Sequence, residues 1–379
     1  MPWRKVDTVD LRREFIALAE HSAIRFSDLC LRYNISRKTG YKWLNRFRSH
    51  GYDGLADRSR RPANHPHQTP PAIEDLVIEL RRSHPAWGGR KLKRVLENRG
   101  HCNIPCPSTI TEILRRKGYL NDQVKSQGPF IRFEHPHPND LWQMDFKGEF
   151  RLPQGYCHPL TVLDDHSRFS LCLQACWNER TDTVKSALIQ VFTRYGLPRR
   201  MSMDNGSPWG SGALTGYTQL TVWLIEQGIT IGHSRPYHPQ TQGKDERFHR
   251  TLQSELIGRR QFDNLQHCQN HFDQWRQIYN TVRPHESLDM QTPAQRYSLS
   301  PLTYRSKLPD YEYSPIDHVR KVGRNLTVSF HRYEIFVGQP FLGKRIAIRP
   351  TQRDGYYTLH FCHQNIAKVD LNHMTKRKN

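Results

Sequence analysis

The sequence predicts a multidomain protein in which an α/β domain lies between all-α N-terminal modules and a small all-β C-terminal domain. Apolar residues recur with a helical period as far as about residue 118, and strand-length and helical runs alternate from residue 140 onward. From about residue 313, short strand-length runs are separated by glycines. The 379 residues allow two to four domains at roughly 100–200 residues each. We predict domains over residues 1–62, 63–125, 126–302 and 303–379.

Basic residues are concentrated in the two flanks of the chain. Lys and Arg number 57 against 36 Asp and Glu, which gives a net charge of +21. Residues 1–125 hold 25 basic and 13 acidic residues, a net +12, and residues 303–379 hold 14 and 6, a net +8. The middle, residues 126–302, holds 18 and 17 and is nearly neutral. Such flanks indicate a polyanionic partner, most often nucleic acid, around a middle that keeps its own carboxylates.

Composition excludes several other classes of protein. No run of 18 apolar residues is present, so we expect no membrane span. The first residues have no apolar segment behind them, so we expect no secretory signal. The eight cysteines show no framework spacing, which favours a reducing cytoplasm over a disulfide scaffold. His101, Cys102 and Cys106 lack a matching second pair of ligands, so no structural zinc is expected.

Residues 10–48 are typical of three helices, the last of them basic. Asn34-Ile35-Ser36 is a turn signal whose serine would cap a helix over residues 37–48, with Leu44 and Phe47 facing inward. A short helix, a tight turn and a basic helix form the helix-turn-helix pattern, whose second helix enters the major groove of DNA. A three-helix bundle with a solvated basic face is the alternative. The residues expected to contact DNA are Arg37, Lys38, Tyr41, Lys42 and Arg46.

A second helical module is predicted after a basic, proline-rich linker over residues 51–71. Helical patterns follow at residues 73–83, 87–99 and 107–118, and Lys117-Gly118 is a C-cap signal. This favours a second helix-turn-helix, and two such modules can read a longer DNA site than one. Arg90 and Lys91 are its expected DNA contacts.

The middle domain is predicted from a change of period. Strand-length runs are expected to form a meander at residues 141–146, 160–163 and 169–173. Helices and strands then alternate over residues 181–195, 201–203, 213–227, 229–231 and 243–258. Three strands followed by alternating helices and strands indicate an α/β layer architecture.

The C-terminal region is expected to be all β. Its strand-length runs are residues 324–330, 333–337, 345–348 and 357–361. Glycine-containing turns separate these runs, and the region is basic. We therefore expect a small five-stranded β-barrel that binds DNA.

Three carboxylates of the middle domain are placed where they can converge. Asp145 lies inside the first strand, Asp204 ends the fourth, and Glu246 lies in the first turn of the helix that begins near Gly243. Strand ends and the helix starts that follow them meet at one edge of an α/β sheet. Converging acids repel unless cations neutralise them, and oxygen ligands suit Mg²⁺ or Mn²⁺. Two such ions, roughly 3.5–4 Å apart, would clamp the attacking and leaving oxygens of an in-line phosphoryl displacement.

Taken singly, two of these acids have simpler explanations. Asp204 precedes Asn205-Gly206 and is also compatible with a plain turn. Glu246 is also compatible with an ordinary acid favoured by the helix dipole. Their order and context argue for all three together.

The three acids lie in motifs that resemble those of a known family. The motifs are Trp142-Gln143-Met144-Asp145-Phe146, Asp164-Asp165-His166-Ser167-Arg168, Met203-Asp204-Asn205-Gly206, Gln242-Gly243-Lys244-Asp245-Glu246-Arg247 and Trp275…Tyr279-Asn280-Thr281-Val282-Arg283-Pro284-His285. In this order, and with the basic N-terminal helix, they resemble the bacterial insertion-sequence DDE transposases with a retroviral-integrase-type core. The resemblance covers most of the chain. It implies an RNase H-like fold and a triad of Asp145, Asp204 and Glu246 that is catalytic and binds two Mg²⁺ (or Mn²⁺) ions.

One spacing departs from the family pattern. Between Asp204 and Glu246 lie 41 residues, more than is usual for the family, and the extra ones are expected near Pro208. Asp245 is the local rival for the glutamate, since a different helix register would aim it at the site instead. Lys244 and Arg247 are expected to contact DNA phosphates, residues 234–243 to form a mobile loop over the site, and Asp164 and Asp165 to be structural.

The resemblance implies a DNA transposase. Its N-terminal modules would bind terminal inverted repeats, and its core would free a 3′-hydroxyl at each element end and join it to target DNA. Two ends must react together, so a homodimer or higher homo-oligomer acting on double-stranded DNA, in the cytoplasm at the nucleoid, is expected. The alternatives are an RNase H-type nuclease, a domesticated DNA-binding regulator without catalysis, and an RNA-binding scaffold.

Overall fold

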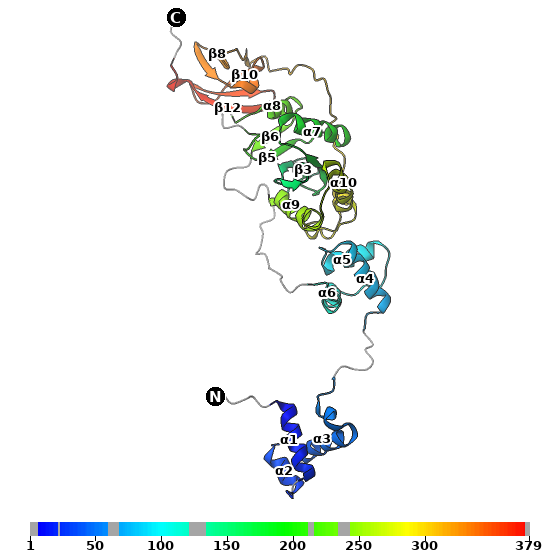
Figure 1. Ribbon diagram of the computed structural model, residues 1–379. Helices are drawn as coiled ribbons and strands as arrows, with labels where there is room; N and C mark the ends of the chain where they lie inside the picture. Colours follow the sequence, from blue (N-terminus) through cyan, green and yellow to red (C-terminus); the bar gives the residue numbers. More distant parts are fainter. Residues whose placement is uncertain are drawn as a thin grey trace. The chain divides into compact units, whose positions relative to one another are not determined.

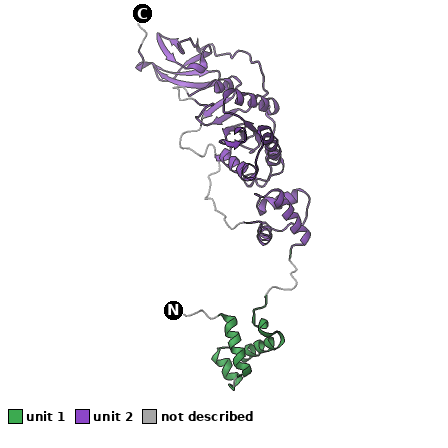
Figure 2. Ribbon diagram, in the orientation of Figure 1, with its two compact units in different colours: residues 1–68 green, residues 69–379 purple. Residues whose placement is uncertain are grey.

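The computed structural model describes residues 7–21, 23–59, 68–120, 134–210, 216–233 and 243–375, in two compact units (Figures 1 and 2). Unit 1 is Met1–Gln68 and unit 2 is Thr69–Asn379. The units have separate hydrophobic cores, so each is described by itself. None of the described helices is long and apolar enough to cross a membrane.

Unit 1 holds the three helices that the sequence predicts. These are α1 (Thr8–His21), α2 (Phe26–Arg32) and α3 (Arg37–His50), followed by the 3₁₀ helix η1 (Gly51–Leu55). Ser36 caps α3, because its hydroxyl accepts a hydrogen bond from the backbone N–H of Thr39 at 3.2 Å. Leu44 is buried as expected and Phe47 is half-buried. The helix-turn-helix arrangement of α2 and α3 is therefore present.

A glycine lets α3 approach its neighbours closely. A Cβ on Gly40 would lie 2.7 Å from the Sγ of Cys30 and 3.1 Å from the ring of Phe15. The unit packs its core around this point with Phe15, Ile16, Leu29, Cys30, Trp43, Leu44 and Leu55.

Unit 2 begins with three further helices. They are α4 (Pro71–Ser83), α5 (Gly89–Asn98) and α6 (Pro107–Arg116), close to the predicted ranges. Gly118 has a φ of +77°, the left-handed conformation expected just beyond a helix end. Their shared core is built from Val77, Leu80, Trp87, Leu92, Val95, Leu96, Ile104, Ile110 and Leu114.

A mixed sheet forms the centre of unit 2 (Figure 1). Its strands are β1 (Trp142–Phe146), β2 (Phe150–Leu152), β3 (Gly155–Asp164), β4 (Ser170–Cys176), β5 (Arg200–Met203) and β6 (Thr230–His233). β1, β3 and β4 pair antiparallel in sequence, which is the expected meander. β5 pairs parallel with β1 and β6 parallel with β5, while β2 adds a short antiparallel pairing to β3. β2 was not predicted, because three residues carry too little periodicity.

Helices cover both faces of this sheet. Apolar residues of α7 (Thr181–Tyr195) and α8 (Gln219–Glu226) pack with one set of strand residues, including Met144 and Val162. Those of α9 (Gly243–Glu255) and α10 (Leu265–Thr281) pack with the other set, including Leu163 and Leu173. The 3₁₀ helices η3 (Ile257–Arg259) and η4 (Glu286–Leu288) and the short α11 (Pro293–Arg296) complete this part. Thus the middle domain is an α/β layer structure with a buried sheet, as predicted.

One predicted helix begins later than expected. The apolar pattern suggested a helix over residues 213–227, but α8 starts at Gln219. Thr218 ends the extended segment before it, since its hydroxyl accepts from the backbone N–H of Thr221 at 3.3 Å and so caps the helix. Residues 211–215 lie outside the described part of the chain.

The expected C-terminal barrel is not what the structure contains. β7 (His318–Lys321), β10 (Arg345–Pro350), β11 (Tyr356–Phe361) and β12 (Gln364–Asp370) form an open four-stranded sheet in the order β12-β11-β10-β7. β8 (Thr327–Phe330) and β9 (Tyr333–Phe336) form a separate two-stranded sheet. The 3₁₀ helix η5 (Gln339–Phe341) interrupts the chain after β9, so β10 pairs with β7 instead of with β9. Because β7 and β12 remain edge strands, the sheet does not close.

Candidate active site

The three acids singled out from the sequence lie at one edge of the central sheet. Asp145 is near the end of β1, which has β3 on one side and β5 on the other. Asp204 directly follows β5, and β5 runs parallel to β1, so both strands end at the same edge. Glu246 lies in the first turn of α9, which packs against β1. The topology therefore brings the predicted triad to one place.

The charges of these acids influence one another. The pKa of Asp145 is raised from 3.8 to about 7, first by burial and then by the negative charges of Asp204, Glu179 and Glu246. The carboxylates are thus close enough to repel. Among the described residues, no group of three or more His, Cys, Asp or Glu side chains is arranged tightly enough to enclose a metal ion. Glu179, which precedes α7, was not found from the sequence, because no local pattern links it to Asp145.

A tight turn fixes Asp204. Its Oδ1 accepts a hydrogen bond from the backbone N–H of Gly206 at 2.9 Å. A Cβ on Gly206 would lie 3.3 and 3.4 Å from the two carboxylate oxygens, tighter than most real Cβ contacts. Trp209 is fully buried and stacks on Phe146, with ring centroids 5.3 Å apart. The residues between Asp204 and Trp209 therefore join the second acid to the strand that carries the first.

The first turn of α9 separates Glu246 from its rival. Asp245 is completely buried, on the side of the helix that carries the buried Phe248 and Leu252, whereas Glu246 is exposed. Neither oxygen of Asp245 has a hydrogen-bond partner among the described residues. Burial, followed by the charges of Asp145 and Asp165, raises the pKa of Asp245 well above its usual value. Glu246 is therefore the acid of this turn that is open to solvent.

Lys244 points into the protein, where it forms an ion pair with the fully buried Asp165. The other oxygen contacts of Asp165 are the side-chain amide of Gln143 and the backbone N–H of His135, each at 2.8 Å. These contacts join α9, β1 and the segment before β1 at one carboxylate. Lys244 thus has a partner inside the protein, which argues against its predicted contact with phosphate. Arg247 is exposed.

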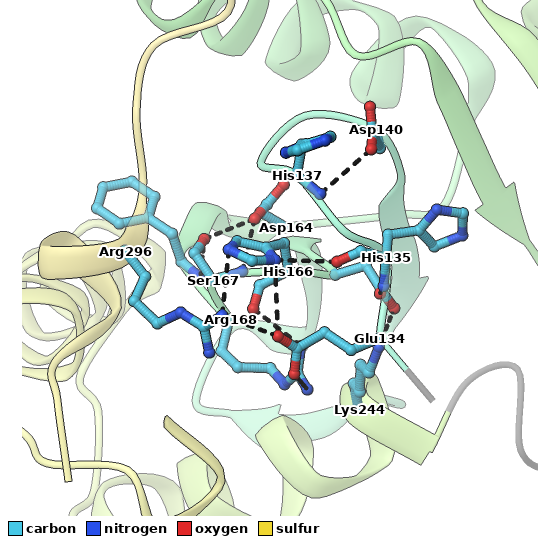
Figure 3. A network of polar contacts seen from close by, with 12 residues as sticks. Glu134, His135, His137, Asp140, Asp164, His166, Ser167, Arg168, Lys244 and Arg296 are labelled. Atoms are coloured by element: carbon cyan, nitrogen blue, oxygen red, sulfur yellow. Dashed lines mark hydrogen bonds and ion pairs between the residues drawn. The ribbon is translucent and has the colours of Figure 1, made fainter. Parts of the chain in front are cut away.

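Asp164 and Asp165 have the structural role that the sequence suggested. Asp164 accepts from the backbone N–H of Asn139 at 2.7 Å. It also accepts from the hydroxyl of Ser167 at 2.6 Å (Figure 3). Beside it, Glu134 pairs with Arg168 at 3.1 Å and with Arg296 at 3.0 Å (Figure 3). This network holds the start of the domain against the turn between β3 and β4.

A histidine that sequence reasoning missed contacts the strand of the first acid. The Nε2 of His249 lies 2.9 Å from the hydroxyl oxygen of Thr161, and this hydroxyl donates to the carbonyl oxygen of Asp145 at 2.9 Å. Burial, and then the charge of Lys147, lowers the pKa of His249 to about 4, so the ring is neutral near pH 7. His249 lies three residues after Glu246, which makes the two neighbours on the surface of a helix. This spacing was the signal that could have identified His249 from the sequence.

The predicted recognition helix presents a basic surface. Arg37, Lys38, Tyr41 and Lys42 are exposed, and Arg46 is half-buried. Lys42 Nζ and Arg46 Cζ lie 5.0 and 4.9 Å from the ring centroid of the buried Trp43. The charged ends of two of the basic side chains therefore lie over a buried aromatic ring.

The two basic residues of the second module are placed differently. Arg90 is exposed, and its guanidinium lies 3.5 Å from the carboxylate of Glu286. Lys91 is half-buried, and burial, followed by the nearby charge of Arg283, lowers its pKa to about 8. Lys91 thus faces other residues of unit 2. Its expected contact with DNA remains a prediction.

The helical stripe downstream closes the domain. Trp275 and Tyr279 are buried in the core that contains Phe248. Arg283 is nearly as buried and pairs with Glu255 at 2.9 Å. The structural interpretation of this stripe is confirmed. Residues 234–242, for which a loop over the site was expected, lie outside the described part of the chain.

Family models match the chain in the order of its domains. A helix-turn-helix domain model matches residues 11–63, and a homeodomain-like domain model matches residues 39–114. Two integrase core domain models match residues 135–239 and 227–293. A model of the IS481 family transposase C-terminal domain matches residues 317–377.

Two curated relatives come from bacterial insertion elements. An uncharacterized 39.2 kDa protein of insertion element IS476 from Xanthomonas euvesicatoria is 26% identical over 247 residues, which is 64% of this chain and 69% of that protein. An uncharacterized 31.7 kDa protein of insertion element IS407 from Burkholderia multivorans is 25% identical, over 58% of this chain and 78% of that protein.

Solved structures of viral integrases are also similar. A chain of the simian T-cell lymphotropic virus intasome, in complex with a PP2A regulatory subunit, matches with 15% identity and a TM-score of 0.37, over 77% of this chain and 99% of that one. The HTLV-2 integrase catalytic core domain in complex with magnesium matches with 18% identity and a TM-score of 0.33, over 43% and 99%.

The matched models and the insertion-element relatives point to the same kind of protein. Helix-turn-helix, integrase core and IS481-type C-terminal models follow one another along the sequence, in the order of the helical modules, the α/β domain and the C-terminal sheets. This chain therefore resembles the insertion-sequence transposases that carry an integrase core.

Proposed function

We propose that this protein is a DNA transposase that cleaves a phosphodiester at each end of its element and joins the freed 3′-hydroxyl to target DNA. The observation that carries the proposal is the convergence of Asp145, Asp204 and Glu246 at one edge of the central sheet. The resemblance to integrase-core transposases supports the same reaction class, polynucleotidyl transfer.

The residues at this edge suit a hard divalent cation. Their donor atoms are all carboxylate oxygens, which Mg²⁺ and Mn²⁺ prefer. The pKa of Asp145 is raised to about 7 first by burial and then by the charge of Asp204, and a bound cation would relieve the repulsion between these acids. We assign the binding of two such ions to Asp145, Asp204 and Glu246. When bound, they would supply Lewis-acid stabilisation of the attacking and leaving oxygens.

The surrounding residues hold these three acids in place. The Asn205-Gly206 turn orients Asp204, and Trp209 packs that turn on Phe146. Asp145 is half-buried and Glu246 is exposed, so the site is open to DNA on the side of Glu246. Arg247, exposed beside Glu246, is placed to contact a phosphate.

DNA recognition is assigned to the N-terminal helices. α3 would enter the major groove and carry Arg37, Lys38, Tyr41, Lys42 and Arg46 to DNA. The net charge of +8 on residues 303–379 suits further contacts with the phosphate backbone. Cleavage and joining at two ends require two active sites, so we propose that a dimer or higher homo-oligomer acts.

The proposal is tested with the full chain and a duplex carrying the terminal inverted repeat that flanks its coding sequence. We expect nicking at the terminal phosphodiester of the repeat in Mg²⁺ or Mn²⁺, followed by joining to target DNA, and neither in EDTA. A duplex with a shuffled repeat is the control. Binding without nicking in either metal favours the regulator, and repeat-independent hydrolysis of an RNA–DNA hybrid favours the RNase H-type nuclease.

The assignment of α3 gives a separate prediction. Replacing Lys42 and Arg46 together with alanine is expected to weaken binding to the inverted repeat and to lower the salt slope of log K by about 0.9 for each phosphate that is no longer neutralised. Arg48→Ala is the control, because Arg48 pairs with Glu20 at 2.9 Å. The measurement is a binding isotherm at four salt concentrations. An unchanged affinity and slope in the double variant would show that α3 does not read the repeat.

A further inference from the structure

We propose that Lys244 and His249 are positioning residues that attach the two flanks of α9 to the sheet and thereby hold Glu246 beside Asp145. The inference rests on the proposed function, because it concerns the placement of the third acid. It replaces the expectation that Lys244 contacts phosphate.

The helical geometry of α9 places these residues on different sides. Successive residues of an α-helix are about 100° apart around its axis. Asp245, Phe248 and Leu252 are buried and mark the side that faces the domain. Lys244 lies on one flank of that side, and His249 lies on the other, together with Glu246. A contact at each flank fixes the rotation of the helix about its axis.

The first attachment is an ion pair inside the protein. Lys244 pairs with Asp165, which is fully buried and directly follows β3. Asp165 also accepts from the amide of Gln143, two residues before Asp145 on β1. One carboxylate therefore connects the strand of the first acid with the turn of the third.

The second attachment reaches the backbone of Asp145 itself. Asp145 and Thr161 are direct cross-strand partners of β1 and β3. The single hydroxyl proton of Thr161 goes to the carbonyl oxygen of Asp145, so the ring N–H of His249 must be the donor to the hydroxyl oxygen. Glu246 and His249 are neighbours on the helix surface, three residues apart. The chain of two hydrogen bonds thus runs from Asp145 to the helix face that carries Glu246.

The position of Lys244 is unfavourable for a residue without an internal role. A cation in the first turn of a helix opposes the helix dipole, so the sequence gains nothing locally from a lysine there. Burial, followed by the charge of Arg168, lowers the pKa of Lys244, which shows that its ammonium is partly withdrawn from water. Both effects are offset by Asp165, which fits an internal attachment better than a phosphate contact.

The test uses the full chain with Lys244→Met and His249→Leu, which remove the attachments, and with Lys244→Arg and His249→Gln, which keep a donor. Loss of a residue that orients a metal ligand costs about 10–100-fold in metal affinity or activity. We therefore expect nicking of the repeat duplex and Mn²⁺ affinity, followed by electron paramagnetic resonance of free Mn²⁺, to fall about 10–100-fold in the removing variants. The conservative variants should recover most of this loss.

The matched control is Arg276→Met. Arg276 is a partly buried cation that joins α10 to the carbonyl oxygen of Leu171 on β4 at 2.8 Å, in the same domain but away from the acids. We expect it to leave nicking and Mn²⁺ affinity unchanged. Affinity for the repeat and its salt slope should be unchanged in every variant, since no attachment residue contacts DNA.

Two results would overturn the inference. Wild-type nicking in both removing variants would show that the attachments do not place Glu246. Weaker repeat binding with a smaller salt slope in Lys244→Met would show that Lys244 contacts a DNA phosphate. If Lys244→Met unfolds the chain because Asp165 has lost its cation, the result for His249→Leu decides the question. That substitution leaves no buried charge without a partner. If wild type itself fails to nick, the proposed function fails, whatever the variants do.

Discussion

Glu246→Gln is expected to reduce cleavage at the element's ends by about 10³-fold or more, because a lost metal ligand removes several kcal/mol of transition-state stabilisation and each 1.36 kcal/mol is tenfold in rate. The side chain is exposed, so its replacement removes no core packing and the fold should be kept. Affinity for the inverted repeat should be unchanged, since recognition is assigned to α3. The measurement is single-turnover nicking of the repeat duplex in Mg²⁺, beside a binding isotherm.

Asp245→Asn is the matched comparison for this prediction. Asp245 is the neighbouring acid, of the same charge, but it is completely buried on the side of the helix that faces the domain. We expect Asp245→Asn to retain most of the nicking rate. Nicking that survives in Glu246→Gln and disappears in Asp245→Asn would show that Asp245, and not Glu246, is the third acid of the site.

Much of the core was predictable because its signals are local. The range of α7 matches the predicted helix, since buried apolar residues such as Val184, Leu188 and Val191 recur at helical spacing. The strand carrying Asp145 and the turn after Asp204 were also correct, because a carboxylate within an apolar run and an Asn-Gly pair are visible in a few residues. The convergence of the acids then followed from a general rule about α/β sheet edges.

What could not be predicted depends on partners far away in the sequence. The residues Lys244-Asp245-Glu246 do not reveal which of them faces Asp165, 79 residues earlier, and which remains exposed. The link from His249 to Thr161 spans 88 residues. The expected C-terminal barrel failed for a similar reason. The sequence indicated how long the strands are but not which strands pair. β10 pairs with β7, and η5 lies between β9 and β10.

Asp145→Asn is expected to abolish nicking and, at the same time, to stabilise the metal-free protein at pH 8 by up to about 4 kcal/mol. The pKa of Asp145 rises from 3.8 in the unfolded chain to about 7 in the folded one, mainly through burial and then through Asp204. Ionisation is therefore harder in the folded state. The folded protein loses stability as the pH rises from about 4 to about 7, and the loss levels off above pH 7. An amide, which never ionises, avoids this loss.

The free energy of unfolding of the core is measured in EDTA at pH 5 and pH 8, for the full chain and for Asp145→Asn. The advantage of the variant should be larger at pH 8 than at pH 5, because the wild-type carboxylate is ionised in the folded state only at the higher pH. Glu246→Gln serves as the comparison and should stabilise the protein much less, since it removes only the last of the causes that raise the pKa of Asp145. An advantage independent of pH would mean that the amide packs better and that ionisation of Asp145 does not limit stability. An advantage that grows with pH, together with lost nicking, would mean that the site is kept at the expense of stability for the sake of its cations.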